Sequence, residues 1–360
     1  MITIVGAGLV GSLWAVLLRR KGIPVQVFER RSDPRKITAG AGRSINLVIT
    51  SRGLYGLEKA GLLGEINKLA VPVFGRMIHS KAGELTYQAY GQSEDYNLSI
   101  SRDLLNQYLI SKAEDAGAKI FFDHTLEELD GENKTLNFKT PQGNFSAQYS
   151  VLFGTDGAGS RVRKQLTKLH PTDFKESTEW LEADYKELTL PLGRDGKPQL
   201  QTNALHIWPR GDHMMMALAN KDGSFTVTLY LPKSSFSKLK TEDQVAKLFN
   251  EEFSDSIPLM KNYINEFMTH PQGTLGTVRT EQWVFDGSIA LMGDAAHAIV
   301  PFFGQGMNSG FEDCTTLAEL LDLHNDHPNW KSILKSYELI QKPNANAIAE
   351  MALENWVEMR

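Results

Sequence analysis

The chain has 360 residues, of which 41% are hydrophobic and 22% charged, and its 38 basic and 43 acidic side chains give a formal net charge of −5. This length predicts about two domains, and the slightly acidic balance gives no reason to expect a nucleic-acid partner. The single cysteine, Cys314, excludes an internal disulfide and fits a reducing compartment. We find no run of about 20 apolar residues that could span a bilayer and no signal peptide. We therefore expect a cytoplasmic protein without a membrane segment in this chain, of unknown oligomeric state and with no metal.

The first half of the chain alternates strands and helices. Residues 1–5 are a short apolar run, which predicts a buried parallel strand. A helix over 11–21 and a strand over 24–30 complete one βαβ unit. Helical spacing recurs over 53–69 and 102–116. Residues 76–91 alternate around an Ala-Gly turn and predict a hairpin, 118–124 predict a strand, and 134–157 predict a second hairpin that leads into a strand.

The middle of the chain has a different character. Residues 203–232 contain three β-like runs joined by Gly-Asp and Lys-Asp-Gly turns, which predict an antiparallel sheet. Two short helices follow residue 240, then a strand and loop over 290–306, then helices to the C-terminus. The predicted fold class is α/β, a Rossmann-type dinucleotide-binding domain with an inserted, mostly antiparallel β-sheet substrate domain. The expected boundaries are 1–70, 98–170 and 280–325 for the first domain, 71–97 and 171–279 for the second, and 326–360 for a C-terminal helical segment.

The loop after the opening strand has the spacing G-x-G-x-x-G. Gly6 permits a tight turn, Gly8 lets the backbone approach a pyrophosphate, and Gly11 lets the helix pack on the sheet. The helix start presents free amides and a positive dipole end to phosphate. Glu29 ends the second strand, where an acid takes ribose hydroxyls. The context predicts a bound dinucleotide rather than a purely structural turn.

Two further loops follow later in the chain, the second of them nearly 290 residues after the glycine turn. Asp156 and Asp294 each end a strand, where a carboxylate can bind the ribityl hydroxyls of a flavin. Gly304, Gln305 and Gly306 then open a helix whose N-terminus would favour the negative charge of a reduced flavin by roughly 0.3–2 kcal/mol. Two such loops suggest two ends of one long ligand and favour FAD over NAD.

Four stretches, GAGLVG, SISRDLLNQYL, GTDGAGSRVR and GDAAHAIVPFFGQGMNSGFED, resemble the FAD-dependent aromatic hydroxylases with the para-hydroxybenzoate hydroxylase fold. The resemblance implies bound FAD, transient NADPH without a second fingerprint, and O2 that reacts through a C4a-hydroperoxyflavin. It places Pro301, Phe302 and Gln305 near the reacting part of the flavin. Further FAD contacts are implied at Leu9, Val10, Arg30, Arg43, Arg102, Leu126, Met307 and Asn308.

Three longer blocks, AGRSINLVITSRGLYGLEKAGLL, LHIWPRGDHMMMALANKDGSFTVTLYLP and QKPNANAIAEMALENWVEMR, resemble the branch of that family that hydroxylates kynurenine. Kynurenine carries a carboxylate, for which a bidentate arginine is the usual partner. The resemblance implies that Arg76, Tyr90 and Asn355 bind this carboxylate. It implies that Leu205, Met216, Leu218 and Tyr230 line the aromatic ring.

Plainer interpretations of the same residues remain open. Arg76 is also typical of a surface charge on a hairpin, and the ring-lining residues are also typical of a sheet core. His297 fits a packing or capping role better than that of a base. The function itself has three alternatives: a hydroxylase of another aromatic acid, a flavin-binding protein without turnover, and an NAD-dependent dehydrogenase. The family also has a region beyond the asparagine segment that supplies another tyrosine and, in eukaryotic relatives, a membrane anchor, whereas the sequence given ends at Arg360.

Overall fold

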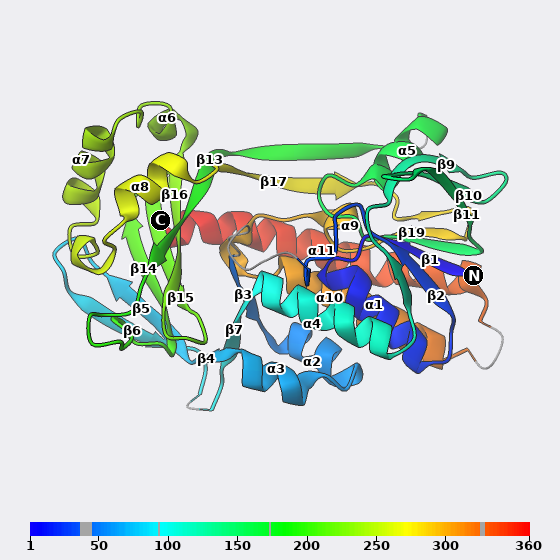
Figure 1. The fold of residues 1–360 in the computed structure, drawn as a ribbon, viewed down its shortest axis with the longest axis horizontal. Helices are drawn as coiled ribbons and strands as arrows, with labels where there is room; N and C mark the ends of the chain where they lie inside the picture. Colours follow the sequence, from blue (N-terminus) through cyan, green and yellow to red (C-terminus); the bar gives the residue numbers. More distant parts are fainter. Residues whose placement is uncertain (37–44, 93, 173, 325–327) are drawn as a thin grey trace.

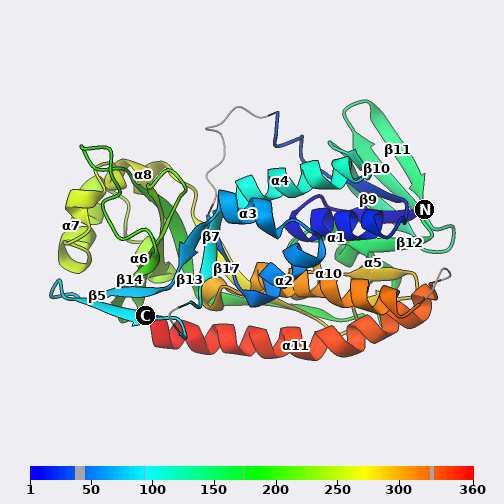
Figure 2. The same cartoon turned by 90° about the horizontal axis from the view of Figure 1, so that it is seen from below.

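The computed structural model describes residues 1–36, 45–92, 94–172, 174–324 and 328–360. Two large sheets lie at opposite ends of an elongated molecule (Figure 1). Two long strands, β13 (Glu176–Leu190) and β17 (Gly273–Thr280), run between them. The last helix, α11 (Trp330–Met359), spans the same distance along one side, as Figure 2 shows. No helix in the described parts of the chain combines the length and the apolar character that crossing a membrane requires.

The six-stranded sheet near the N-terminus has the order β18-β19-β12-β1-β2-β8. Its strands are β1 (Ile2–Val5), β2 (Val25–Phe28), β8 (Lys119–Phe121), β12 (Val151–Gly154), β18 (Val284–Phe285) and β19 (Ile289–Leu291). All neighbours are parallel except β18 with β19. Every residue of β1 and β12 is buried, as a parallel sheet covered on both faces requires.

Helices surround this sheet. They are α1 (Leu9–Arg20), α2 (Ser51–Lys59), α3 (Leu63–Leu69), α4 (Arg102–Asp115), α5 (Arg161–Leu169), the short α9 (Asp294–His297) and α10 (Gly306–Asp322). Trp14 of α1 is fully buried, with its ring 5.3 Å from that of Phe153 on β12 in an edge-to-face arrangement. Such aromatic contacts, with the aliphatic side chains around them, fix α1 on the sheet.

The seven-stranded sheet has the order β17-β13-β16-β15-β14-β5-β6. The strands not yet given are β5 (Gly75–His79), β6 (Leu85–Ala89), β14 (Ala204–Arg210), β15 (His213–Ala219) and β16 (Phe225–Pro232). All pairs are antiparallel except β5 with β14. Helices α6 (Lys233–Phe236), α7 (Glu242–Glu252) and α8 (Tyr263–Thr269), with the 3-10 turn η1 (Ile257–Leu259), pack on one face. The other face meets the 3-10 turn η2 (Pro301–Phe303) and the end of α11.

Two three-stranded sheets complete the fold. One contains β9 (Thr125–Asp130), β10 (Thr135–Thr140) and β11 (Gly143–Gln148), and the other contains β3 (Asn46–Ile49), β4 (Val71–Val73) and β7 (Asn97–Ser101). The second of these lies beside α2 and α4, between the two large sheets (Figure 1).

The predicted α/β class and the inserted antiparallel sheet are confirmed, with two differences in detail. The helix expected over 53–69 is wrong, because Gly61 has a φ of +61° and the segment divides into α2 and α3. The strands β13 and β17 were not expected. The first seven residues of β13 are almost all exposed, so the hydrophobic alternation that marks a strand is missing there.

Candidate functional site

The carboxyl ends of three parallel strands meet at one edge of the six-stranded sheet. Val5 pairs with Gly154, and Gly154 pairs with Leu291. The glycine turn at Gly6 therefore lies next to the loop that follows β12 and, one strand further, next to Gly293. Loops from both ends of the sequence converge on this edge, where ligands of open α/β sheets bind.

Val10, in the first turn of α1, is the point at which these loops touch. A Cβ added to Gly293 would lie 2.9 Å from Cγ2 of Val10, and one added to Gly310 of α10 would lie 2.5 Å from the same atom. Cys314, one turn further along α10, is fully buried and its thiol lies 3.5 Å from the Val10 carbonyl. The starts of α1 and α10 are thus parts of one packed unit.

The glycines of the first loop differ in what surrounds them. Gly6 has a φ of +111°, and a Cβ at Gly11 would lie 2.0 Å from the Gly6 carbonyl oxygen, so both positions require glycine. Gly8 has an ordinary φ of −72°, and a Cβ there would meet nothing within 4 Å among the described residues. This open space in front of the helix amides fits a pyrophosphate. The residues present therefore fit an FAD, whose phosphates would lie against the start of α1.

The two acids predicted to bind a flavin differ in their environment. Asp294 begins α9 and is exposed. Asp156 accepts hydrogen bonds from the hydroxyl of Ser160 and from the backbone of Arg161 and Val162, so its carboxylate caps α5. Asp294 is consequently the carboxylate that can turn toward ribityl hydroxyls, whereas Asp156 shapes the adjacent turn.

The other predicted FAD contacts lie around the same edge. Both oxygens of Glu29 accept backbone hydrogen bonds, from Ala7 at 2.8 Å and from Arg31 at 2.9 Å, which ties the end of β2 to the glycine turn. Arg30 is exposed beside it. Leu126 is buried, and its carbonyl accepts a hydrogen bond from Arg161 at 2.8 Å. Leu9 and Val10 form the first turn of α1, directly after the glycine turn. Arg102 begins α4 and is exposed, and Arg43 lies outside the described residues.

The start of α10 is fixed by side chains rather than left free. The Asn308 amide donates to the carbonyls of Val48 and Gly304, and its oxygen accepts from the Thr50 backbone at 2.9 Å. The side chain of Gln305 is buried with its amide 3.4 Å from the Thr50 hydroxyl. Contact between this turn and a cofactor would therefore come from the backbone of 304–308, with Met307 half-buried against the core.

His297 has a structural partner, as the sequence suggested. Its Nε2 lies 2.8 Å from Oδ2 of Asp313, which also accepts the backbone N–H of Gly293 at 2.7 Å. Burial alone would lower the pKa of His297, but the charge and hydrogen bond of Asp313 and the charge of Asp294 outweigh it, so the pKa is raised. This pair holds the loop on which Asp294 sits.

We expect the His297 pair to make stability depend on pH. Because the folded-state pKa is raised above the usual value of about 6.5, the contribution is complete below that pH and is lost as the pH rises through the folded-state pKa. Replacing His297 with Gln should reduce the free energy of unfolding by about 1–3 kcal/mol at low pH and should flatten this dependence. Urea unfolding between pH 6 and pH 9 measures both effects.

His213 supplies the matched control for this experiment. It pairs with Asp212 at the exposed turn between β14 and β15, and exposed pairs contribute little. His213→Gln should change the free energy of unfolding less than His297→Gln does. An unchanged profile in His297→Gln would show that the buried pair does not hold the loop.

On the substrate side, Arg76 and Tyr90 lie together on the β5 and β6 hairpin. The guanidinium carbon of Arg76 is 5.7 Å from the centre of the Tyr90 ring. The Nε of Arg76 is buried and has no hydrogen-bond partner among the described residues. Burial raises the pKa of Tyr90, so its hydroxyl stays protonated and can donate. An unsatisfied buried donor beside a protonated phenol is an arrangement suited to a carboxylate.

The four residues predicted to line an aromatic ring lie in one cluster between the two halves of the molecule. Leu205, Leu218 and Tyr230 are buried there, with Met216 and Tyr90 packed at the edge. Phe302 of η2 belongs to the same cluster, with its ring 5.1 Å from that of Tyr230. Pro301 begins η2. The cluster therefore joins the substrate sheet to the loop that leads into α10.

The last turns of α11 close this cluster. Asn355 donates hydrogen bonds to the carbonyl of Phe302 and to the sulfur of Met359, which connects the helix to η2. Trp356 packs its ring 4.2 Å from that of Phe302 and 6.3 Å from that of Tyr230. Sequence reasoning missed Trp356. The signal was its spacing of four from Ala352, since both face the cluster.

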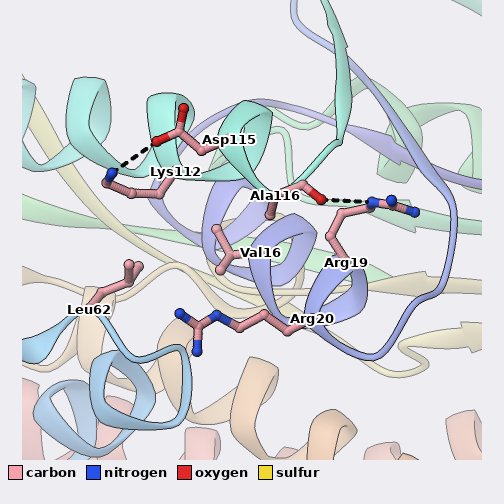
Figure 3. A pocket seen from close by; sticks show the side chains of 7 residues that line it. All are labelled: Val16, Arg19, Arg20, Leu62, Lys112, Asp115 and Ala116. Atoms are coloured by element: carbon pink, nitrogen blue, oxygen red, sulfur yellow. Dashed lines mark hydrogen bonds and ion pairs between the residues drawn. The ribbon is translucent and has the colours of Figure 1, made fainter.

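A pocket of about 460 Å³ lies elsewhere, between the ends of α1 and α4 (Figure 3). Its lining residues are Val16, Arg19, Arg20, Leu62, Lys112, Asp115 and Ala116. Arg19 already donates to the Ala116 carbonyl, and Lys112 is paired with Asp115 at 2.9 Å. The pocket is about 16 Å along α1 from the glycine turn, so we do not assign it to the cofactor or the substrate.

Known proteins resemble this chain over nearly its whole length. A family model described as an FAD binding domain matches residues 1–352. Kynurenine 3-monooxygenase of Myxococcus xanthus is 44% identical over 366 residues, which cover 100% of this chain and 78% of that protein. The chain belongs to the kynurenine 3-monooxygenase family. Another member, from Flavobacterium johnsoniae, is 41% identical over 99% of this chain and 80% of its own length.

Solved structures of other proteins share the fold of this chain. A 2-methyl-3-hydroxypyridine-5-carboxylic acid oxygenase superimposes with a TM-score of 0.79 at 18% identity, over 98% of this chain and 89% of that one. Pseudomonas aeruginosa PqsL gives 0.80 at 20% identity, over 99% and 96%. At these identities the likeness concerns the fold, which is that of FAD-dependent hydroxylases.

Proposed function

We propose that the chain is an FAD-dependent monooxygenase that converts L-kynurenine, NADPH, O2 and a proton into 3-hydroxykynurenine, NADP⁺ and water. One observation carries the substrate assignment: a buried, unsatisfied arginine donor and a protonated tyrosine lie beside an apolar cluster that adjoins the cofactor loops. The identity of 40–44% to several kynurenine 3-monooxygenases supports the choice of substrate.

The cofactor and the protein would contribute differently to the reaction. FAD, when bound, accepts two electrons from NADPH and supplies one atom of O2 in a form that an aromatic ring can attack. The start of α1 and the loop at Asp294 would hold it. The protein's own contribution is to bind, to orient and to exclude water.

Arg76 and Tyr90 are the proposed anchors for the amino-acid carboxylate. Anchoring one end of kynurenine leaves its aryl ring to lie in the apolar cluster, against Leu205, Leu218 and Phe302. In this pose Asn355 acts mainly through Phe302, whose carbonyl it holds.

The ring chemistry makes few demands on acid or base catalysis. The aryl amine of kynurenine donates electron density to the carbon ortho to it, so that carbon is nucleophilic without help from a protein base. Burial raises the pKa of Tyr230 well above its usual range, so this residue remains neutral beside the ring. Its proposed role is to pack and to exclude water.

We expect kynurenine to stimulate NADPH oxidation in the FAD-loaded protein, because a hydroxylase of this kind should couple reduction to substrate binding. The measurement is NADPH absorbance with and without kynurenine, together with the mass of the product, which should be heavier by one oxygen atom. Stimulation by hydroxybenzoate or salicylate instead would indicate a different aromatic acid. Equal NADPH consumption with unchanged kynurenine would indicate a flavin-binding protein without turnover.

A further inference from the structure

A chain of three polar side chains, two of them buried imidazoles, lies behind the substrate sheet. We call it the rear polar chain and define it as Asp255, His79 and His206. His79 ends β5 and His206 lies on β14, and both imidazoles are more than nine-tenths buried. Their nitrogens, Nε2 of His79 and Nδ1 of His206, are 2.8 Å apart. Nothing in the proposed chemistry uses these groups, and burying polar rings is costly unless they are satisfied.

The partners of His206 fix the direction of its hydrogen bonds. Its Nε2 lies 2.9 Å from the carbonyl of Gln201, which can only accept, so Nε2 carries the proton. Burial, opposed by that hydrogen bond, lowers the pKa of His206 to about 4, and the ring is neutral. Nδ1 of His206 is therefore an acceptor, and Nε2 of His79 donates to it.

The far end of the rear polar chain is anchored on the loop after α7. Nδ1 of His79 lies 3.5 Å from Oδ2 of Asp255, and the indole N–H of Trp208 donates to the same oxygen at 2.7 Å. Arg210 adds a contact of 3.7 Å to Oδ1 and donates to the His79 carbonyl at 2.9 Å. The side chain of His79 is thus held by His206, and its backbone is held by Arg210.

Strand geometry connects this chain to the proposed carboxylate site. Side chains alternate along a strand, so Arg76 and Ile78 of β5 face one side and His79 faces the other. In the pairing of β5 with β14, Arg76 lies opposite Leu205 and Ile78 lies opposite Ile207. On its outer side β5 meets only β6, all of whose residues are exposed. Besides its pairing with β14 and β6, β5 is tied to the rest of the sheet by the buried side chain of His79.

The position of β5 matters because no described residue satisfies the Nε of Arg76. The described contact of its guanidinium is with Tyr90, at the end of the neighbouring strand, so the direction of the side chain depends on how β5 and β6 are held. We propose that the rear polar chain is a positioning device, which holds β5 against β14 and so places Arg76 for the substrate carboxylate. This inference rests on the proposed function and concerns the same site.

The test compares two ligands in the FAD-loaded protein. One is kynurenine, and the other is an analogue that keeps the aryl ketone and both amines but lacks the carboxylate. Perturbation of the flavin absorbance gives the Kd of each. His79→Leu removes the hydrogen bond to His206 and should raise the Kd of kynurenine about tenfold, which corresponds to the contribution of one hydrogen bond. It should leave the Kd of the analogue unchanged. His79→Gln, which keeps a donor for His206, should recover most of the affinity.

Two further measurements separate positioning from general damage. In an Arg76→Ala background, His79→Leu should have no additional effect on kynurenine binding. Asp255→Ala, at a partly exposed position, should also raise the Kd of kynurenine. It replaces His79→Leu in the test if that variant does not fold. Equal weakening of both ligands, or additive effects with Arg76→Ala, would overturn the proposal. Failure of the proposed function is recognised separately, since wild-type protein would then not bind kynurenine at all.

Discussion

Replacing Arg76 with Ala should raise the KM for kynurenine by about ten- to a hundredfold, since a charged hydrogen bond is worth roughly 1.5–3 kcal/mol. FAD should stay bound, because Arg76 lies on the substrate sheet and not at the edge formed by β1, β12 and β19. The maximal rate should change less than KM, as expected when uniform substrate binding is removed. Steady-state kinetics with flavin content as a second readout measure this.

The same hairpin offers a control. Lys81 lies in the turn between β5 and β6, is largely exposed and is paired with Glu252 at 2.9 Å. Lys81→Ala removes the same charge from the same element and should leave KM unchanged. If Arg76→Ala also left KM unchanged, the carboxylate would bind elsewhere.

Replacing Gly8 with Val should abolish FAD binding while the apoprotein remains folded. The φ of −72° at Gly8 is allowed for any residue, and a Cβ there would meet nothing within 4 Å among the described residues. The folded protein can therefore accommodate a side chain at this position. The side chain would fill the space in which the backbone approaches the pyrophosphate. The purified variant should therefore contain no flavin, because the pyrophosphate and the new side chain would need the same space.

Two other glycines make this experiment specific. Gly64 is the second residue of α3, and a Cβ there would also meet nothing within 4 Å among the described residues. Gly64→Val should therefore retain FAD. Gly11→Val should lose both FAD and thermal stability, because its Cβ would collide with the Gly6 carbonyl. Flavin absorbance and the Tm of the apoprotein separate the three outcomes. Retention of FAD by Gly8→Val would mean that the phosphates lie elsewhere.

Much of the cofactor edge could be predicted from the sequence because it depends on local rules. A glycine turn after an apolar strand requires particular backbone angles, and parallel strands bring their carboxyl ends together wherever they lie in the chain. The loops near Gly6 and Asp294, which were predicted to hold two ends of one ligand, lie at the same edge of the sheet in the register of β1, β12 and β19. The resemblance to a known family added the substrate.

The features that escaped prediction depend on tertiary contacts. Trp356 faces the apolar cluster that contains Tyr230 and Phe302 only because α11 runs the length of the molecule and ends there (Figure 2). The hydrogen bond from the Asn308 amide to the Val48 carbonyl of β3 joins residues 260 positions apart, so no local sequence pattern predicts it. The contact of His79 with His206 likewise needs the parallel pairing of β5 with β14, which neither strand specifies alone. The roles proposed for individual residues remain predictions for the experiments above.

The most direct test of the whole account is the source of the oxygen in the product. The FAD-loaded protein should be supplied with kynurenine, NADPH and oxygen-18 gas, and the product analysed by mass spectrometry. We predict hydroxykynurenine with one labelled oxygen atom on the ring, formed by the wild-type protein and not by Gly8→Val. Unlabelled product, or consumption of NADPH while kynurenine remains unchanged, would contradict it.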